Sequence, residues 1–163
     1  MAMRQQLAVF LAALWWGGIS GLSFVAVPTL FAKLGAPVAG PVAAQLFSLQ
    51  CWLGLGIGLA LLLVLRRARA DAQFPLAGEV VDPARLAQMQ RVLTTMGFVL
   101  GGLLLALLQE FGVAQKIVTA RAAGGDLRLW HALGTLMVLG QWLCSGAVLF
   151  RLSLHFEGAS GAK

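Results

Sequence analysis

Four long stretches of this chain contain no Asp, Glu, Lys or Arg, and this pattern limits the possible folds more than any other feature. The stretches run from Leu7 to Phe31, Gly35 to Leu65, Val92 to Leu108 and Leu129 to Phe150, and all eighteen such charged residues lie outside them. About 20 apolar residues in a helix cross the ~30 Å hydrocarbon layer, whereas a charge at its centre costs several kcal/mol. We therefore predict an all-α integral membrane protein with four spans.

The spans and their connections occupy nearly all of the 163 residues, which predicts a single four-span membrane domain over residues 1–163. The expected spans are residues 7–31, 42–65, 91–110 and 129–151, with external loops 32–41 and 111–128 and a cytoplasmic loop 66–90. A cleaved signal peptide is the alternative at the N-terminus, where Arg4 precedes an apolar run. The run continues to Phe31, however, and this length favours a retained helix.

Lys and Arg are unequally divided between the two sides of the predicted spans. One side has Arg4, Arg66, Arg67, Arg69, Arg85, Arg91, Arg151 and Lys163, and the other has Lys33, Lys116, Arg121 and Arg128. The positive-inside rule then predicts an antiparallel four-helix bundle with both termini cytoplasmic (N-in/C-in). We expect this multi-pass protein to lie in the cytoplasmic (inner) membrane. This topology accounts for the net charge of +6, so we expect the lipid bilayer as partner and no nucleic acid.

A basic cluster directly follows the second span, at Arg66, Arg67 and Arg69. Such clusters commonly fix topology and need no further explanation, which is the interpretation we favour. Binding of anionic lipid headgroups is the alternative.

Glycine lies near the middle of every predicted span. In three spans two glycines are separated by three residues: Gly17 with Gly21, Gly54 with Gly58, and Gly97 with Gly101. Small residues let helix backbones approach closely in lipid, and close approach drives helix association. We predict that these glycines pack helices, within the chain, between copies in a homo-oligomer, or against a membrane protein partner. With twenty glycines in the chain, chance also produces such pairs.

Glu110 and His131 are the ionisable pair that the predicted topology brings together, at the external ends of the third and fourth spans. Such a pair could relay a proton, bind a cation or line a substrate entrance. We favour the alternative, in which Glu110 reaches the interface and His131 makes a helix-end hydrogen bond. Ser23, Gln50 and Gln141 complete the candidate polar site, either as a small vestibule or, as we favour, as satisfied interhelical hydrogen bonds.

Motifs for metals, cofactors and catalysis are missing from the sequence. His131 and His155 are 24 residues apart on one predicted helix, about 36 Å, so they cannot ligate one haem within a protomer. Cys51 and Cys144 lie inside spans without a C-x-x-C motif, and we expect them to be small apolar fillers. We therefore expect no cofactor, no metal site and no enzymatic activity.

Several short motifs resemble a known family. They are Gly21, Leu22, Ser23 and Phe24 with Pro28 and Phe31, then Leu46 with Phe47, and His131 with Ala132. These motifs, with the number and order of spans, are similar to the bacterial branch of the transmembrane protein 205-like family, although the W-x-E-P pattern of its eukaryotic-like members is absent near Glu110. The resemblance implies a four-helix membrane fold and no settled activity.

Two functions follow from these features. We favour a non-enzymatic membrane protein that acts through helix packing, as an oligomer or as an accessory of a membrane complex. The alternative is a small transporter or permeation pathway that uses Glu110 and His131. A lipid-modifying or quinone enzyme ranks third, because no catalytic pair accompanies the predicted fold.

Overall fold

The computed structural model describes residues 2–71 and 83–160, and the elements in those ranges are helices. Helix α1 (Ala2–Ser20) continues through a π-helical turn, η1 (Gly21–Ala26), into α2 (Val27–Asp71). Helix α3 (Pro83–Leu107) continues through a second π-helical turn, η2 (Leu108–Ala114), into α4 (Gln115–Ala123), and α5 (Leu127–Ser160) is the last element. The predicted all-α class is confirmed.

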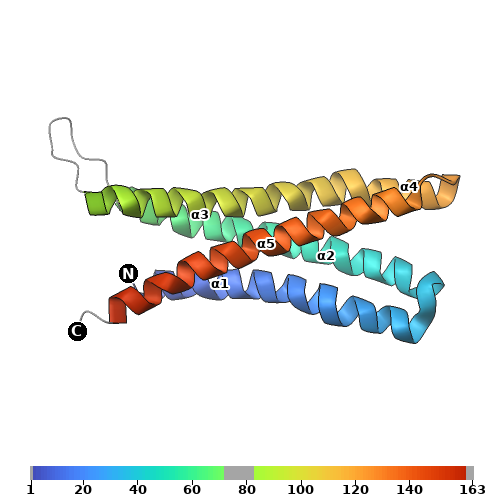
Figure 1. Ribbon diagram of the computed structural model, residues 1–163, viewed down its shortest axis with the longest axis horizontal. Helices are drawn as coiled ribbons and strands as arrows, with labels where there is room; N and C mark the ends of the chain where they lie inside the picture. Colours follow the sequence, from blue (N-terminus) through green and yellow to red (C-terminus); the bar gives the residue numbers. More distant parts are fainter. Residues whose placement is uncertain (1, 72–82, 161–163) are drawn as a thin grey trace.

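The chain reverses its direction inside α2, at Gly35. Its φ of 70° and ψ of 162° are not helical, and glycine adopts a positive φ without the steric cost that a Cβ would add. As a result, α1 and the later part of α2 lie side by side (Figure 1). The expected external loop 32–41 is thus a turn at one residue. Pro37 does not break the helix, because it falls in the first turn after Gly35, where an N–H has no helical acceptor.

The other helix ends follow ordinary capping chemistry. Helix α3 begins at Pro83, and proline is tolerated at the first helical position because its missing N–H would have no helical acceptor there. Helix α4 ends at Gly124, whose left-handed backbone lets its N–H donate to the Ala120 carbonyl at 3.0 Å. The Asp126 carboxylate accepts a hydrogen bond from the Leu129 N–H at 3.0 Å, which caps α5. Most of the expected loop 111–128 is therefore helical.

Three helical segments are long and apolar enough to cross a membrane: Met3–Arg67, Pro83–Ile117 and Leu127–Leu154. The first of them contains the reversal at Gly35. Large apolar side chains are exposed along all three, including Phe10, Leu14, Trp52, Leu53, Leu100, Leu104, Leu139, Leu143 and Phe150. An exposed apolar surface of this extent is unfavourable in water and is the surface expected against lipid chains.

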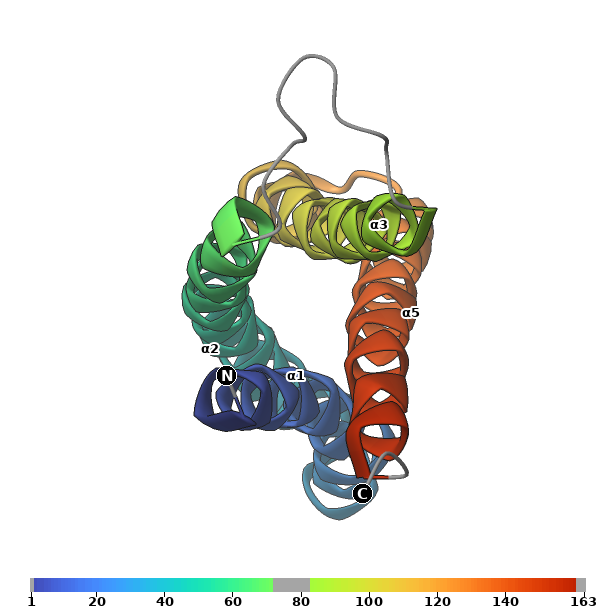
Figure 2. The same ribbon diagram turned by 90° about the vertical axis from the view of Figure 1, so that its left-hand side faces the viewer.

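Seen along its length, the molecule is a ring of helices (Figure 2). Helix α1 packs against α2 and α5, and α3 packs against the same two helices from the opposite side. The chain begins and ends at one end of the bundle, where α3 also begins (Figure 1). Each long helix therefore has two neighbours, and side chains that reach inward meet at the centre of the ring.

Trp15 of α1 fills that centre, with only 1% of its surface exposed. Glycines on two other helices leave space for its indole ring. A Cβ added at Gly54 of α2 would lie 2.9 Å from Trp15 Nε1, and one at Gly102 of α3 would lie 2.8 Å from Trp15 Cη2. Trp16 is seated in the same way, because a Cβ at Gly146 of α5 would lie 2.9 Å from its Nε1. Two consecutive tryptophans thus bring α1 into contact with the three other long helices.

The six glycines that we predicted to pack helices fall into two groups. A Cβ at Gly58 would lie 2.5 Å from Leu103, and one at Gly101 would make an ordinary contact with Cys144 at 3.6 Å. Together with Gly54, these residues face other helices of the chain. A Cβ at Gly17, Gly21 or Gly97 would meet nothing within 4 Å, so these three do not mediate close packing within the chain.

Substitution of Gly54 tests the packing of the Trp15 ring against this glycine. We expect Gly54→Ala to cost about 1–3 kcal/mol of unfolding free energy relative to Gly56→Ala, because its methyl group displaces a buried ring. Gly56 is a matched control on the same helix, since a Cβ there meets nothing within 4 Å and the gain in helix propensity is the same. Unfolding in mixed detergent micelles measures both. Equal stabilities of the two variants would contradict the packing described for Trp15.

Candidate functional site

Three hydrogen bonds between side chains of different helices define the candidate site. Ser48 Oγ donates to Glu110 Oε1 at 2.6 Å, Gln141 Nε2 donates to Gln109 Oε1 at 2.7 Å, and Trp142 Nε1 donates to Ser20 Oγ at 2.9 Å. We call these six residues the polar layer. The first of these bonds joins α2 to η2, the second joins α5 to η2, and the third joins α5 to α1.

The polar layer lies within the bundle and not at its end. Ser48 follows Gly35 by thirteen residues, about 20 Å of helix, and precedes Arg66 by eighteen, about 27 Å. Gln141 follows Arg128, towards one end, by thirteen residues and precedes Arg151, towards the other, by ten. The Glu110 carboxylate is therefore deeper than the interfacial position that the sequence predicts.

Glu110 faces α2, where its hydrogen bond from Ser48 is partly buried. Helix α3 and its extension η2 contact both α2 and α5. Successive residues of a helix point in directions about 100° apart, so Gln109 and Glu110 turn towards different neighbours. Gln109 faces α5 and Glu110 faces α2. Close to this contact, Trp52 of α2 and Phe111 of η2 pack edge to face, with ring centroids 6.0 Å apart.

His131 is exposed on α5, and within the described chain its side chain makes no hydrogen bond or ion pair. Its backbone carbonyl accepts a hydrogen bond from Thr135 Oγ1 at 2.9 Å. The structure therefore joins Glu110 to Ser48, and among the described residues no hydrogen bond or ion pair joins Glu110 to His131. The physical reason is that Gln109 occupies the face of η2 that is turned to α5.

The Gln109–Gln141 pair is the most buried part of the polar layer, with 8% and 2% of the two residues exposed. Gln141 Nε2 also approaches the Met137 carbonyl at 3.4 Å. The prediction that Gln141 bonds across to another helix agrees with this geometry, but Ser23 and Gln50 are not its partners. Gln50 lies against Gly18 of α1, and the Ser23 hydroxyl is buried without a hydrogen bond in the described part of the chain.

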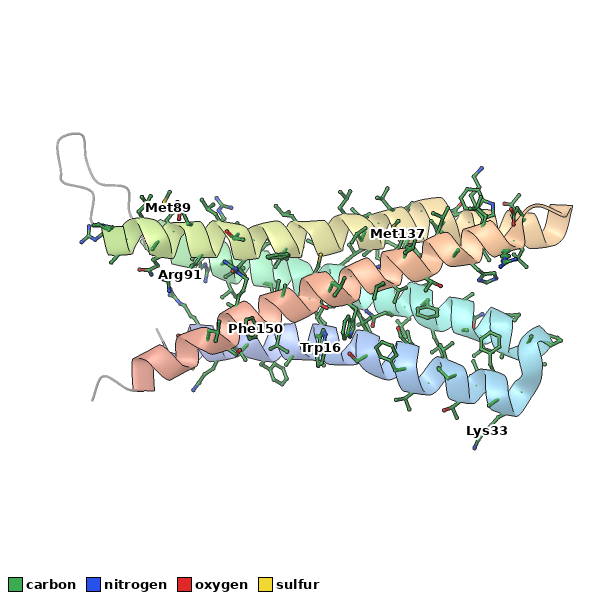
Figure 3. The ribbon with its side chains drawn as sticks, viewed as in Figure 1. Trp16, Lys33, Met89, Arg91, Met137 and Phe150 are labelled. Carbon is green, nitrogen blue, oxygen red and sulfur yellow. The ribbon has the colours of Figure 1, made fainter. Side chains whose placement is uncertain are left out.

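Ser20 links the polar layer to an aromatic cluster. Its hydroxyl donates to the Trp16 carbonyl at 2.8 Å and accepts the Trp142 indole N–H at 2.9 Å. The Trp142 ring lies 5.8 Å from that of Trp16 and 6.0 Å from that of Phe24, between centroids. Trp16 points inward from α1 in Figure 3, on the side that faces α5. This cluster holds α1 and α5 together at the depth of the polar layer.

Ser48 and Gln109 were not among the candidate residues that we took from the sequence. Serine is common in membrane helices, so Ser48 does not differ from its surroundings in pattern. Gln109 has a clearer signal, because it is an amide inside an apolar helix. Its direction, however, depends on the π-helical turn η2, which changes the register of the helix after Leu107. Projection on an ideal α-helix cannot anticipate that change.

The predicted basic cluster lies near the C-terminal end of α2. Arg66 and Arg67 are exposed there, whereas the side chain of Arg69 lies outside what the structure describes. Among the described residues, no group of three or more His, Cys, Asp or Glu is placed to hold a metal ion. The chemistry available in the polar layer is that of hydrogen bonds and one carboxylate.

Long apolar helices, an apolar exposed surface and an interior closed by interhelical hydrogen bonds are the features of a helical membrane protein. The chain belongs to the family described as "Domain of unknown function (DUF4149)", whose pattern matches residues 10–126. The matched region contains Trp15, Ser48 and Glu110 and ends before α5, which provides Gln141. No curated protein and no solved structure matches the chain.

The buried amide pair makes a testable contribution to stability. We expect Gln141→Leu to cost about 1 kcal/mol of unfolding free energy, because it leaves the Gln109 amide without its partner in a buried site. The double variant Gln109→Leu with Gln141→Leu should cost no more than the single one. Thr135→Val is the control, since that exposed hydroxyl bonds only within its own helix. Additive losses in a double-mutant cycle would show that the two amides do not interact.

Proposed function

We propose that this protein is a non-enzymatic, four-span protein of the inner membrane that acts through helix packing, as an oligomer or as an accessory component of a membrane complex. The main observation in support is the polar layer. Its polar side chains bond directly to one another between helices, at 2.6 to 2.9 Å. Polar groups used in this way stabilise helix association and leave no open path between them.

Four crossings follow if the chain passes through the membrane on each side of Gly35. The reversal there places Lys33 (Figure 3) at the opposite end of the bundle from the start of α1, which contains Arg4, and from the end of α2, which contains Arg66 (Figure 1). With the excess of Lys and Arg at the end that has both termini, the positive-inside rule favours the N-in/C-in orientation. Four spans in this order also suit the proposed relation to the transmembrane protein 205-like family.

Two cavities of the described surface lie away from the polar layer. One of about 360 Å³ is an open apolar depression lined by Val25, Ala26, Thr29, Leu30, Lys33 and Leu34. Another of about 200 Å³ lies between α3 and α5, at Arg91 and Arg151. Neither is lined by Glu110, Gln109 or Gln141, which favours packing over permeation as the role of these residues.

The outer surface of α1 and of the start of η1 offers a place for association. Gly17 and Gly21 are exposed, and a Cβ at either would meet nothing within 4 Å. These glycines therefore have no packing role within the chain, while their spacing is that of helix pairs that approach closely in lipid. We place the contact with a second copy or a partner protein on this face.

Permeation is the second candidate, and one observation favours it. The Glu110 carboxylate lies inside the bundle, and ionisable residues at such depth commonly belong to ion or proton pathways. A transporter of this kind would use Glu110 with Ser48, because His131 is exposed and does not contact them.

Cross-linking in native membranes, followed by mass spectrometry, tests the proposed function. We expect a cross-linked species that contains this chain, and we expect Gly17→Leu with Gly21→Leu to reduce it several-fold without loss of folded protein. Gly56→Leu is the control, since Gly56 is also exposed and free of contacts.

A chain that stays monomeric and captures no partner in these membranes would contradict the proposal. The same protein in liposomes distinguishes the second candidate. A proton or cation flux that Glu110→Gln removes and His131→Ala leaves unchanged would establish permeation in place of packing.

A further inference from the structure

A small basic pocket lies between α3 and α5, at the end of the bundle that has both chain termini. It has a volume of about 200 Å³ and is lined by Arg91, Thr95, Arg151 and Leu154. Figure 3 shows Arg91 near the start of α3, and Phe150 just before Arg151 on α5. The pocket is separate from the polar layer and from the Arg66 and Arg67 cluster on α2.

The arginines of this pocket lack acidic partners in the described chain. Arg151 Nε donates to Thr95 Oγ1 at 3.2 Å, and its terminal guanidinium N–H groups make no hydrogen bond or ion pair with the described residues. The same holds for the side chain of Arg91. Two guanidinium groups around a shared pocket, without counter-charges among the described residues, form a site for an anion, and their planar donors match the oxygens of a phosphate.

Thr95 holds one of these guanidinium groups in place. It is 4% exposed, its hydroxyl donates to the Arg91 carbonyl at 2.8 Å, and the same oxygen accepts the Arg151 Nε–H. The Arg151 guanidinium also lies over the Phe98 ring, 5.9 Å from its centroid. Arg151 is thus positioned by contacts that leave its terminal N–H groups available to a ligand.

The location of the pocket suggests the source of the anion. Arg91 directly precedes the apolar stretch that begins at Val92, and Arg151 directly follows the one that ends at Phe150. Both therefore lie at the depth of the lipid headgroups. Leu154 in the pocket wall and Phe98 beside it are exposed, at 51% and 37%, and offer an apolar surface next to the charges. A ligand with a phosphate and an apolar tail satisfies both parts.

We propose that Arg91, Thr95 and Arg151 form a binding site for the phosphate of an anionic phospholipid, whose acyl chains lie along Leu154 and the neighbouring surface of α3 and α5. With the N-in/C-in orientation, the site faces the cytoplasmic leaflet. Basic pockets between membrane helices on this side are suited to such headgroups. Inorganic phosphate in solution has the same anionic chemistry as the headgroup, but it has no apolar part to contact Leu154 and Phe98.

Native mass spectrometry of the full-length protein in detergent, titrated with phosphatidylglycerol or phosphatidylcholine, tests the proposal. We expect the wild type to bind one phosphatidylglycerol more tightly than phosphatidylcholine. Each arginine near a lipid headgroup contributes about 1 kcal/mol, or roughly fivefold in affinity. Arg91→Gln should therefore weaken phosphatidylglycerol binding about fivefold, and Arg91→Gln with Arg151→Gln about 25-fold.

Arg66→Gln with Arg67→Gln is the matched control, because it removes the same charge at the same end of the molecule without touching the pocket. It should weaken binding less than twofold. Arg91→Gln is the variant less prone to misfold, since the Arg91 side chain is exposed and makes no hydrogen bond or ion pair with the described residues. Equal losses in the two double variants, or equal binding of the two lipids, would overturn the proposal. Displacement of the lipid by millimolar inorganic phosphate would assign the site to a soluble anion and overturn the lipid assignment.

Discussion

The packing of Trp15 into the centre of the helix ring is the interaction on which the rest of the structure depends. Lipid gives no hydrophobic advantage to apolar side chains that leave it, so these helices must associate through close contact and hydrogen bonds. Trp15 supplies contact area to α2 and α3, where Gly54 and Gly102 provide the space. Its indole N–H, which faces Gly54, has no hydrogen-bond partner in the described chain. The position of Trp15 is therefore determined by the fit of its ring, and a methyl group at Gly54 or Gly102 would occupy the space of that ring.

The polar layer follows from that packing. Once Trp15 and Trp16 fix α1 against the other helices, Ser20 lies beside Trp142. The same arrangement places η2 between α2 and α5, so that Ser48 meets Glu110 and Gln109 meets Gln141. Each of these hydrogen bonds is worth about 1 kcal/mol or less in a membrane, and together they define which helices are neighbours. The Glu110 carboxylate is held by its hydrogen bond from Ser48, without an acidic or basic partner among the described residues.

Charge-free stretches predicted the all-α class of this chain, because the energy of a charge in lipid is large compared with local propensity. The helix start at Pro83 and the left-handed break at Gly124 follow from local capping chemistry. The partner of Glu110 was beyond such signals. It depends on the π-helical turn at Leu108–Ala114 and on which neighbours flank η2, and both are properties of the packed bundle. The outward position of Gly17 and Gly21 is likewise invisible in a spacing pattern that they share with Gly54 and Gly58.

Packing closes the interior at the level of the polar layer, and the reactivity of Cys51 reports on this closure directly. This native thiol is 1% exposed on α2, one turn from Ser48. In a Cys144→Ala background, the rate of its reaction with a small, water-soluble methanethiosulfonate can be measured in liposomes, with Lys33→Cys as an exposed reference. A closed interior predicts that Cys51 stays unmodified until the protein is unfolded, while the reference thiol reacts fully. Modification of Cys51 in the folded protein at a rate near that of the reference would contradict the account.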